Sequence, residues 1–268
     1  MRPSSERYGG PDGDPGPGGE GPRPPGPCDG TECDPDLLRA ATVITEEVRD
    51  LRPHEVPDRL CAVALRLLPV AGASVSLSGE GMPVRLGASG ELAAGLAEIQ
   101  ASLGEGPCLD AAREGSPVLA PDLRDGRDAH RWPVFALAAT AAGARAVYSI
   151  PVGDSEVTVG TLDLHRTLPG PLSARELRRA ELVARVMALA VTALPRQENA
   201  GAADEDWLSG LAAEHDEVYQ AVGMTMAQLG IGADEALARL RGHAFAQGRT
   251  ALELAREVVA RRERLDDG

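Results

Sequence analysis

Residues 214–265 read EHDEVYQAVGMTMAQLGIGADEALARLRGHAFAQGRTALELAREVVARRERL and set the architecture of the C-terminal quarter of the chain. Two short breaks that contain glycine, at residues 230–232 and 247–249, divide the stretch into three segments. In each segment apolar residues recur every three or four positions, which predicts an amphipathic helix. Because an amphipathic helix must bury its apolar face against another element, we expect the three helices to pack as a small bundle.

The predicted helices of this bundle begin at residue 207 or 214, at residue 233 and at residue 251. Thr250 and Glu253 have the spacing of a capping box, in which each side chain accepts a hydrogen bond from a backbone N–H at the start of the helix. The expected inner faces, helix by helix, are Leu211, Val218, Val222, Met226 and Leu229; Leu237, Leu240 and Ala244; and Leu252, Ala255 and Val259.

The bundle is basic although the chain is acidic. From residue 236 to residue 265 there are seven arginines and three acids, a balance of 7 − 3 = +4, whereas the whole chain has a formal net charge of −14. Bulk electrostatics therefore argue against binding of nucleic acid or anionic lipid by the whole surface, and a polyanion would have to be met locally. The arginines that could neutralise phosphate or stack on an unpaired base are Arg241, Arg249, Arg256, Arg261 and Arg262.

A simpler interpretation of these arginines is a solvated helix face, because Glu253 and Glu257 lie among them at helical spacing. A helix-turn-helix DNA-binding domain is a second alternative. Its recognition helix would need polar side chains at its start, whereas Ala251, Leu252 and Leu254 occupy that position here.

Residues 1–35 contain nine glycines and nine prolines and almost no large apolar side chain, so we expect a disordered tail. Cys28 and Cys33 in this tail lack two further ligands at matching spacing, which argues against zinc. The five histidines of the chain are widely separated and form no metal motif. We expect neither a metal nor a cofactor.

The chain shows no apolar run long enough to span a membrane and no leader with a basic segment followed by an apolar one. Its four cysteines are too few and too scattered for a disulfide framework. These features predict a soluble cytoplasmic protein without membrane contact.

Residues 36–194 predict an α+β domain: an antiparallel sheet with helices packed on one side of it and inserted between its middle strands. A polar linker is expected over 195–206, followed by the bundle at 207–265. The expected helices are 37–51, 56–68, 91–103, 108–113, 132–142 and 173–194; the strands are 72–79, 83–87, 117–121, 144–152 and 156–165; and residues 122–131 are expected as a loop.

The predicted α+β domain resembles the GAF sensor domain of actinobacterial regulators. The resemblance is carried by the segments 104–110 (GEGPCLD), 131–133 (RWP) and 160–164 (GTLDL), together with Val118 and Asp122. It implies a ligand pocket between the sheet and the inserted helices, which Cys108, Arg131, Trp132 and Tyr148 could approach. From the residues alone, Cys108 is equally a small buried hydrophobe and Trp132 a core residue, and a bilin or redox role for Cys108 would need a lowered thiol pKa.

The predicted bundle resembles the ANTAR domain, an RNA-binding module of transcription antitermination regulators. The residues that carry this resemblance are Ala221-Val-Gly-Met224, Asp234-Glu-Ala-Leu237, Leu240-Arg241, Ala244, Arg249, Ala255 and Val258-Val259. It implies binding to stem-loops in a nascent transcript, with Ala221, Gly223 and the five arginines at the RNA. One departure is Val222, which stands where many members of the family carry a basic residue.

The sequence contains no Gly-rich phosphate loop, nucleophile elbow or paired-carboxylate motif, so we expect no enzymatic activity. We expect a signal-responsive regulator that binds RNA stem-loops and promotes antitermination, with an unknown small-molecule ligand in the GAF-like domain. The net acidic charge and Val222 keep open a sensor or scaffold that acts through protein contacts alone. The apolar helices 37–51 and 177–194 predict a homodimer.

Overall fold

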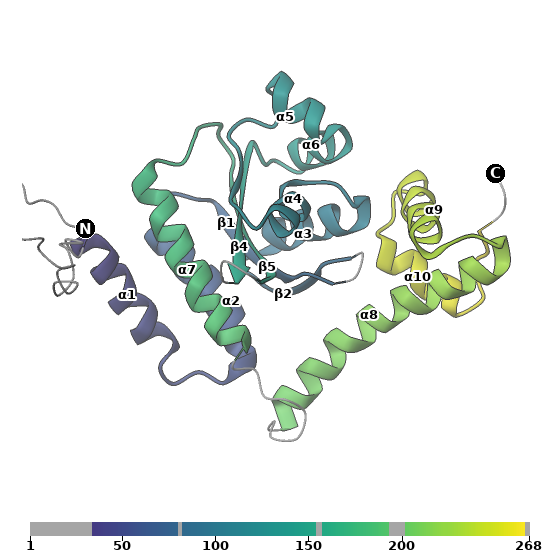
Figure 1. Ribbon diagram of the computed structural model, residues 1–268, viewed down its shortest axis with the longest axis horizontal. Coiled ribbons are helices and arrows are strands. Elements are labelled where there is room, and N and C mark those ends of the chain that lie inside the picture. The colour runs from purple at the N-terminus through teal and green to yellow at the C-terminus, as the bar shows by residue number, and fades with distance from the viewer. Residues whose placement is uncertain (1–33, 80–81, 154–156, 193–201, 266–268) are drawn as a thin grey trace, which may run out of the picture. The chain divides into compact units, whose positions relative to one another are not determined.

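The computed structural model describes residues 34–79, 82–153, 157–192 and 202–265 (Figure 1). The chain divides into two units, Met1–Asp34 and Pro35–Gly268, and every helix and strand described below lies in the second. The predicted disordered tail, with Cys28 and Cys33, falls outside the described residues.

The order of elements follows the predicted alternation of helices and strands. The elements are α1 Pro35–Val48, the 3-10 helix η1 Pro53–Glu55, α2 Val56–Leu67, β1 Gly72–Leu77, β2 Val84–Ala88, α3 Glu91–Leu103, α4 Pro107–Glu114, β3 Val118–Ala120, α5 Gly126–Arg131, α6 Pro133–Ala141, β4 Ala146–Gly153, β5 Thr158–Arg166, α7 Ala174–Thr192, α8 Ala202–Leu229, α9 Ala233–Ala246 and α10 Ala251–Val259.

Local chemistry explains several helix ends. Gly104 follows α3 with φ of 66° and Gly115 follows α4 with φ of 63°, a left-handed conformation that glycine adopts without a steric penalty. Before α7, Ser173 N–H donates to Glu176 Oε2 at 2.6 Å and Glu176 N–H donates to Ser173 Oγ at 3.3 Å, which confirms the capping box predicted there.

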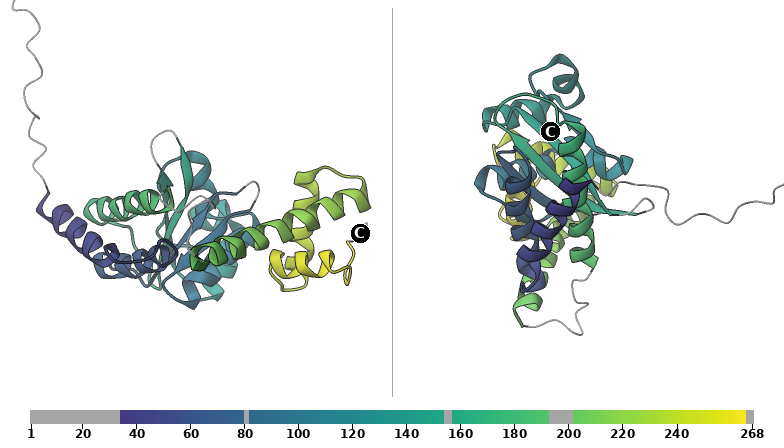
Figure 2. Two further views of the ribbon diagram at one scale, coloured as in Figure 1. Left: turned by 90° about the horizontal axis from the view of Figure 1, so that it is seen from below. Right: turned by 90° about the vertical axis from the view of Figure 1, so that its left-hand side faces the viewer.

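Within the described residues the strands form one five-stranded antiparallel sheet in the order β2-β1-β5-β4-β3. Helices α1, α2 and α7 pack together on one face of this sheet, and α3 and α4 pack on the other (Figures 1 and 2). The prediction that helices cover one side of the sheet was therefore wrong. The central strands β4 and β5 are buried at most of their positions, so the side chains of both faces need helices to cover them.

The two faces of the sheet differ in chemistry. The face toward α2 and α7 is apolar, and its central residues are Ala73, Val75, Tyr148, Ile150, Leu162 and Leu164. Toward α3 and α4, the strands present the buried polar residues Ser74, Ser76, Ser149, Thr161, Asp163 and His165. Because side chains alternate along a strand, one set of strands supplies an ordinary core on one face and a polar surface on the other.

Helices α8, α9 and α10 contact one another around an apolar core that also includes Met82 and the α3 residue Ala101, and α3 packs against α9 and α10. The bounds of α9 agree with the prediction, and Thr250 caps α10 by accepting from Glu253 N–H at 3.1 Å. The buried face of α10 is Leu254, Ala255 and Val258; the predicted Leu252 and Val259 are only partly buried at its border.

Two predicted loops are partly helical. Helix α5 occupies the end of the expected loop 122–131, where a six-residue helix offers no apolar periodicity to detect. Helix α8 begins at Ala202, inside the polar stretch expected to be a linker. Alanine and acidic residues there have the helix propensity and the charge that suit the first turns of a helix.

Candidate functional site

The polar face of the sheet has a row of three side chains at its centre. Ser74 on β1 and Ser149 on β4 are both register partners of Asp163 on β5, so the three residues lie side by side across the sheet. On the same face, His165 lies over Gly72, where an added Cβ would sit 2.2 Å from the imidazole ring. The close approach of the ring therefore requires glycine at position 72. Burial of the imidazole lowers the pKa of His165 to about 4.

Asp163 is the centre of a buried hydrogen-bond network. Ser149 Oγ donates to its carboxylate at 2.5 Å and Gln100 Nε2 from α3 donates at 3.3 Å. The amide oxygen of Gln100 accepts the backbone N–H of Cys108 at 2.9 Å and so holds the start of α4. Burial raises the pKa of Asp163 to about 7, and the bonds from Ser149 and Gln100 oppose that rise.

A cavity of about 340 Å³ lies beside this network, within the size range of small-molecule sites. Its wall includes polar and charged side chains from β1, α4 and β5, among them Ser76, Arg113 and Thr161. Cys108 also lines it, as the prediction of a ligand pocket requires. The cavity thus combines polar side chains of the sheet with two arginines, Arg113 and Arg241, a combination that suits a small polar ligand.

The Cys108 thiol itself is poorly suited to nucleophilic chemistry. Burial, with a smaller contribution from the charge of Asp163, raises its pKa well above the ordinary thiol value. A bilin attachment or a redox switch needs thiolate, which a lowered pKa would supply. Cys108 is therefore a buried hydrophobe at the edge of the cavity, the simpler of the two interpretations.

Arg131 and Trp132 are brought together, but around a carboxylate of α4. Asp110 accepts from Arg131 Nε and from the Trp132 indole N–H, both at 3.0 Å. The Arg131 guanidinium stacks over the Trp132 ring at 4.7 Å, and it also pairs with Glu114 at 2.8 Å. These contacts tie α5 to α4 and do not place either side chain in the wall of the cavity.

Tyr148 lies on the opposite face of the sheet from Cys108. It is fully buried in the apolar core under α7, and its hydroxyl donates to the Gly170 carbonyl. The sheet register therefore separates Tyr148 from the cavity, because residues one position apart on a strand face opposite sides.

In the ANTAR-like bundle, α8 carries Ala221, Val222 and Gly223. Ala221 and Val222 are buried in the bundle core, so the family's basic residue would lose its hydration at position 222. Gly223 is exposed, and a Cβ added there would meet no atom within 4 Å. Of the two small residues predicted at the RNA, the structure leaves Gly223 on the surface and buries Ala221.

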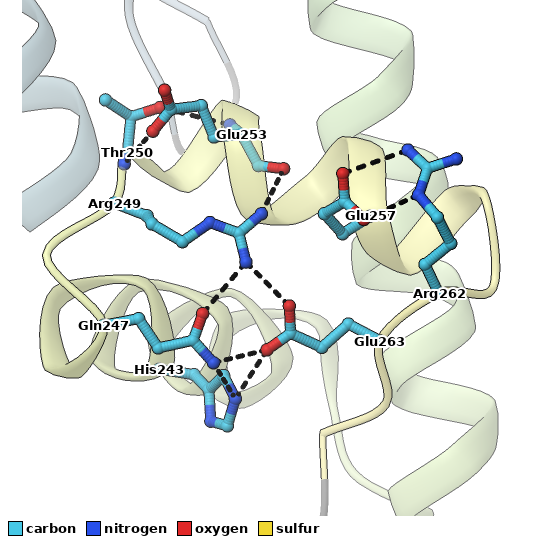
Figure 3. A network of polar contacts seen from close by, with 8 residues as sticks. All are labelled: His243, Gln247, Arg249, Thr250, Glu253, Glu257, Arg262 and Glu263. Carbon is cyan, nitrogen blue, oxygen red and sulfur yellow. Dashed lines mark hydrogen bonds and ion pairs between the residues drawn. The ribbon is translucent and has the colours of Figure 1, made fainter.

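The predicted RNA-binding arginines are mostly paired with acids. Arg249 pairs with Glu263, Arg256 with Glu217 and Arg262 with Glu257, each at 2.7 Å (Figure 3 shows the first and third pairs). Arg261 is exposed, in a left-handed conformation with φ of 57°. The basic edge expected from composition is thus largely neutralised within the bundle itself.

Arg241 differs from the other arginines because it is half-buried. Its guanidinium lies against Gly104 and lines the cavity near Cys108, and burial lowers its pKa. A half-buried guanidinium is less available to RNA than those of Arg256 and Arg262, whose side chains are 47% and 63% exposed. The structure therefore separates Arg241 from the other four predicted residues.

Sequence reasoning missed the residues that organise both networks. In the GAF domain these are Gln100 of α3 and Ser149 and Asp163 of the sheet. For the two sheet residues, the signal was a set of polar residues at alternate positions of otherwise apolar strands. In the bundle the missed residues are Glu263 and its partners His243 and Gln247. No local spacing connects Glu263 with them, because they lie 16 and 20 residues away.

Neither a membrane span nor a metal cluster is seen in the described segments of the chain. No helix among them is long and apolar enough to cross a bilayer. Within the same residues, no group of three or more His, Cys, Asp or Glu side chains could hold a metal ion.

Comparisons with known proteins assign both regions. Residues 50–192 match the GAF domain family and residues 208–259 match the ANTAR domain family. No curated protein shows significant similarity to the chain.

The solved structures similar to this chain are remote relatives. A GAF domain of a phosphoenolpyruvate-protein phosphotransferase from Coxiella burnetii is 16% identical, with 59% of this chain and 93% of that chain covered and a TM-score of 0.46. A free methionine-R-sulfoxide reductase from Neisseria meningitidis is 13% identical, with 58% and 86% covered and a TM-score of 0.42. The family matches, together with the antiparallel sheet and the C-terminal helices, show that the chain belongs to the GAF domain family and carries an ANTAR domain after its GAF domain.

Proposed function

We propose that this protein is a cytoplasmic, signal-responsive regulator whose ANTAR domain binds RNA stem-loops in a nascent transcript and promotes antitermination. The observation that carries the proposal is the match of residues 208–259 to the ANTAR domain. The surface arginines support it: the side chains of Arg249, Arg256 and Arg262 are 28%, 47% and 63% exposed. Exposed ion pairs contribute only about 0–1 kcal/mol, so RNA phosphates can displace the acids that hold these arginines.

Binding of the full chain to RNA with two stem-loops tests this proposal. Arg256→Ala should weaken binding and reduce the slope of log affinity against log salt by about 0.7–0.9, the value of one lost phosphate contact. Arg239→Ala is the matched control, because Arg239 is an exposed arginine of α9 paired with Glu235 and was not predicted at the RNA. Absence of stem-loop binding by the full chain would contradict the proposal.

A regulator that acts through protein contacts alone is the second candidate. The observation that favours it is the neutralisation of Arg249, Arg256 and Arg262 by acids of the same bundle, together with the net charge of −14. The salt dependence separates the two candidates. Recovery of a protein partner without RNA, by contacts whose affinity hardly changes with salt, would favour protein recognition.

We further propose that the GAF domain receives a small polar ligand in the cavity beside Cys108 and that the protein is a homodimer. The polar wall of the cavity supports the first proposal. For the dimer, the support is exposed apolar surface on the helical layer: Leu38 of α1 is 55% exposed and Leu189 of α7 is 69% exposed. A monomeric mass in light scattering at micromolar concentration would contradict the dimer.

A further inference from the structure

The chain folds back on the bundle after α10. We name residues 261–265 the C-terminal strap. Arg261 reverses the chain direction with its φ of 57°, and the backbone N–H groups of Arg262 and Glu263 donate to the Glu257 carbonyl at 2.9 and 3.3 Å. At the far end of the strap Leu265 is 2% exposed in the bundle core, and Gln228 Nε2 of α8 donates to its carbonyl at 2.7 Å. The strap is thus anchored at both ends.

Between these anchors, the Glu263 carboxylate lies among three nitrogen-bearing side chains (Figure 3). Arg249 Nη1 donates to Oε2 at 2.7 Å, His243 Nε2 lies 3.2 Å from Oε1, and Gln247 Nε2 donates to Oε1. The three side chains come from α9 and from the α9–α10 connection, whereas Glu263 belongs to the strap. The Glu263 carboxylate of the strap therefore contacts side chains that α9 and the α9–α10 connection supply.

Two contacts that do not involve Glu263 hold Arg249 in place. Arg249 Nη1 also donates to Gln247 Oε1 at 2.9 Å, and Arg249 Nη2 donates to the Glu253 carbonyl at 3.1 Å. His243 Nε2 lies near both Gln247 Nε2 and Glu263 Oε1, and it donates to the carboxylate when it carries a proton. A guanidinium and an amide N–H₂ that converge on one point, with this imidazole beside them, form a site for an oxyanion.

The Glu257–Arg262 pair is an ordinary ion pair of the same bundle, in which one carboxylate contacts a single side chain. Arg262 contacts Glu257 through two nitrogens, at 2.7 and 3.0 Å, and only these two side chains take part in the contacts drawn (Figure 3). It is an exposed pair of neighbouring residues, whereas the Glu263 site joins residues 14 to 20 positions apart. The two glutamates thus carry the same charge but have different surroundings.

We propose that Arg249, Gln247 and His243 form a binding site for an RNA backbone phosphate and that Glu263 of the strap occupies it as an intramolecular competitor. The inference rests on the proposed RNA binding of the ANTAR domain. The Glu263 side chain is 21% exposed and that of Arg249 is 28% exposed, so a phosphate can reach the donors from solvent once the carboxylate moves. A backbone phosphodiester carries the same single negative charge as a carboxylate and also presents two unesterified oxygens, so it can take the place of the Glu263 carboxylate at the arginine fork.

The test compares the full-chain variants Glu263→Gln and Glu235→Gln, which remove the same charge from the same bundle. Glu235 of α9 pairs with Arg239, which was not predicted at the RNA. Glu263→Gln should raise affinity for a stem-loop RNA about 3- to 10-fold and steepen the salt slope by about 0.7–0.9. Glu235→Gln should change affinity less than about 2-fold, the effect of the charge alone. Adding Arg249→Ala to Glu263→Gln should abolish the gain. Equal gains in the two glutamate variants would overturn the proposal.

A second measurement does not use RNA. Inorganic phosphate titrated into Glu263→Gln should shift the NMR resonances of the His243 ring, assigned by comparison with His243→Gln, at lower phosphate than wild type requires. Glu263→Asp withdraws the carboxylate by one methylene and keeps the charge, so it should give an intermediate response. Thermal unfolding checks that each variant is folded. If Glu263→Gln does not fold, the phosphate titration of the wild-type protein, followed at the His243 ring, takes its place.

The outcomes separate the two proposals. A phosphate response at His243 in Glu263→Gln without RNA binding by any variant overturns the proposed function and supports the anion site. RNA binding by wild type, with no phosphate response at His243, overturns the anion site and leaves RNA binding in place.

Discussion

The GAF domain and the ANTAR domain each hold a carboxylate among hydrogen-bond donors, and the two carboxylates respond in opposite ways. Asp163 is 5% exposed on the polar face of the sheet, and its pKa is raised to about 7. Glu263 is partly exposed in the bundle, and its pKa is lowered, first by the hydrogen bond from Gln247 and then by those from Arg249 and His243, although burial opposes them. The presence of hydrogen-bond donors therefore does not by itself decide whether the pKa of a carboxylate rises or falls.

The main difference is access to water. Asp163 is buried, and its two partners, Ser149 and Gln100, do not replace the hydration that the ionised carboxylate loses. Glu263 keeps part of its hydration, and the hydrogen bonds from Gln247, Arg249 and His243 together outweigh its burial. A buried carboxylate therefore stays protonated to higher pH, whereas a partly hydrated one with several donors stays ionised to lower pH.

The largest expected effect is on the buried carboxylate. Between its ordinary pKa of 3.8 and its folded pKa of about 7, Asp163 holds a proton in the folded state that the unfolded state releases. Its contribution to the free energy of unfolding is therefore complete below pH 3.8 and is lost as pH rises toward 7. Asp163→Asn does not titrate, so its stability relative to wild type should rise by about 2–3 kcal/mol between pH 5 and pH 8.

Urea unfolding of both proteins at several pH values measures this effect. Asn fits the same volume and can hydrogen-bond with Ser149 and Gln100. A difference in the free energy of unfolding that is the same at every pH therefore measures the change in packing and hydrogen bonding. If the two stability curves run parallel from pH 5 to pH 8, Asp163 does not titrate in that range and the contrast with Glu263 fails.

A smaller effect is expected at the helix cap next to the bundle network. Thr250→Ala removes the oxygen that accepts from Glu253 N–H and should lower the free energy of unfolding by about 1 kcal/mol. Ser173→Ala makes the same change in the capping box of α7 in the GAF domain and should have an effect of similar size. Calorimetry of the two variants measures both; a loss in only one would show that its capping box contributes less than the geometry indicates.

The smallest effect is expected for Glu263→Gln on stability, as distinct from RNA binding. Because the pKa of Glu263 is lowered, its contribution is present above the ordinary value of 4.5 and is lost as pH falls through the folded pKa. The variant should lose less than about 1 kcal/mol at pH 7, the range of surface ion pairs, and the loss should disappear at low pH. This pH dependence is opposite in sign to that of Asp163, and thermal melts at pH 3 and pH 7 check it; a loss that grows toward low pH would reverse the assignment.

Most elements could be predicted because their signals are local. The bounds of α3 and α9 follow from apolar spacing and from flanking glycines, and both capping boxes follow from a three-residue spacing of Ser or Thr with Glu. Helix α5 escaped because six residues are too few to show a period. Cys108 lines a cavity, although its part in ligand binding stays a prediction, whereas Arg131 and Trp132 contact Asp110.

The order of helices and strands, the resemblance to GAF and ANTAR domains and the presence of arginines in the bundle all follow from the sequence. What those arginines contact, and which polar residues are buried, became clear from the packing of separate elements. Apolar periods and capping spacings act within one element, so they can be read along the chain. The pairing of Arg249 with Glu263 and the burial of Asp163 depend on distances between separate elements and on the exclusion of water, which exist only after the elements have packed.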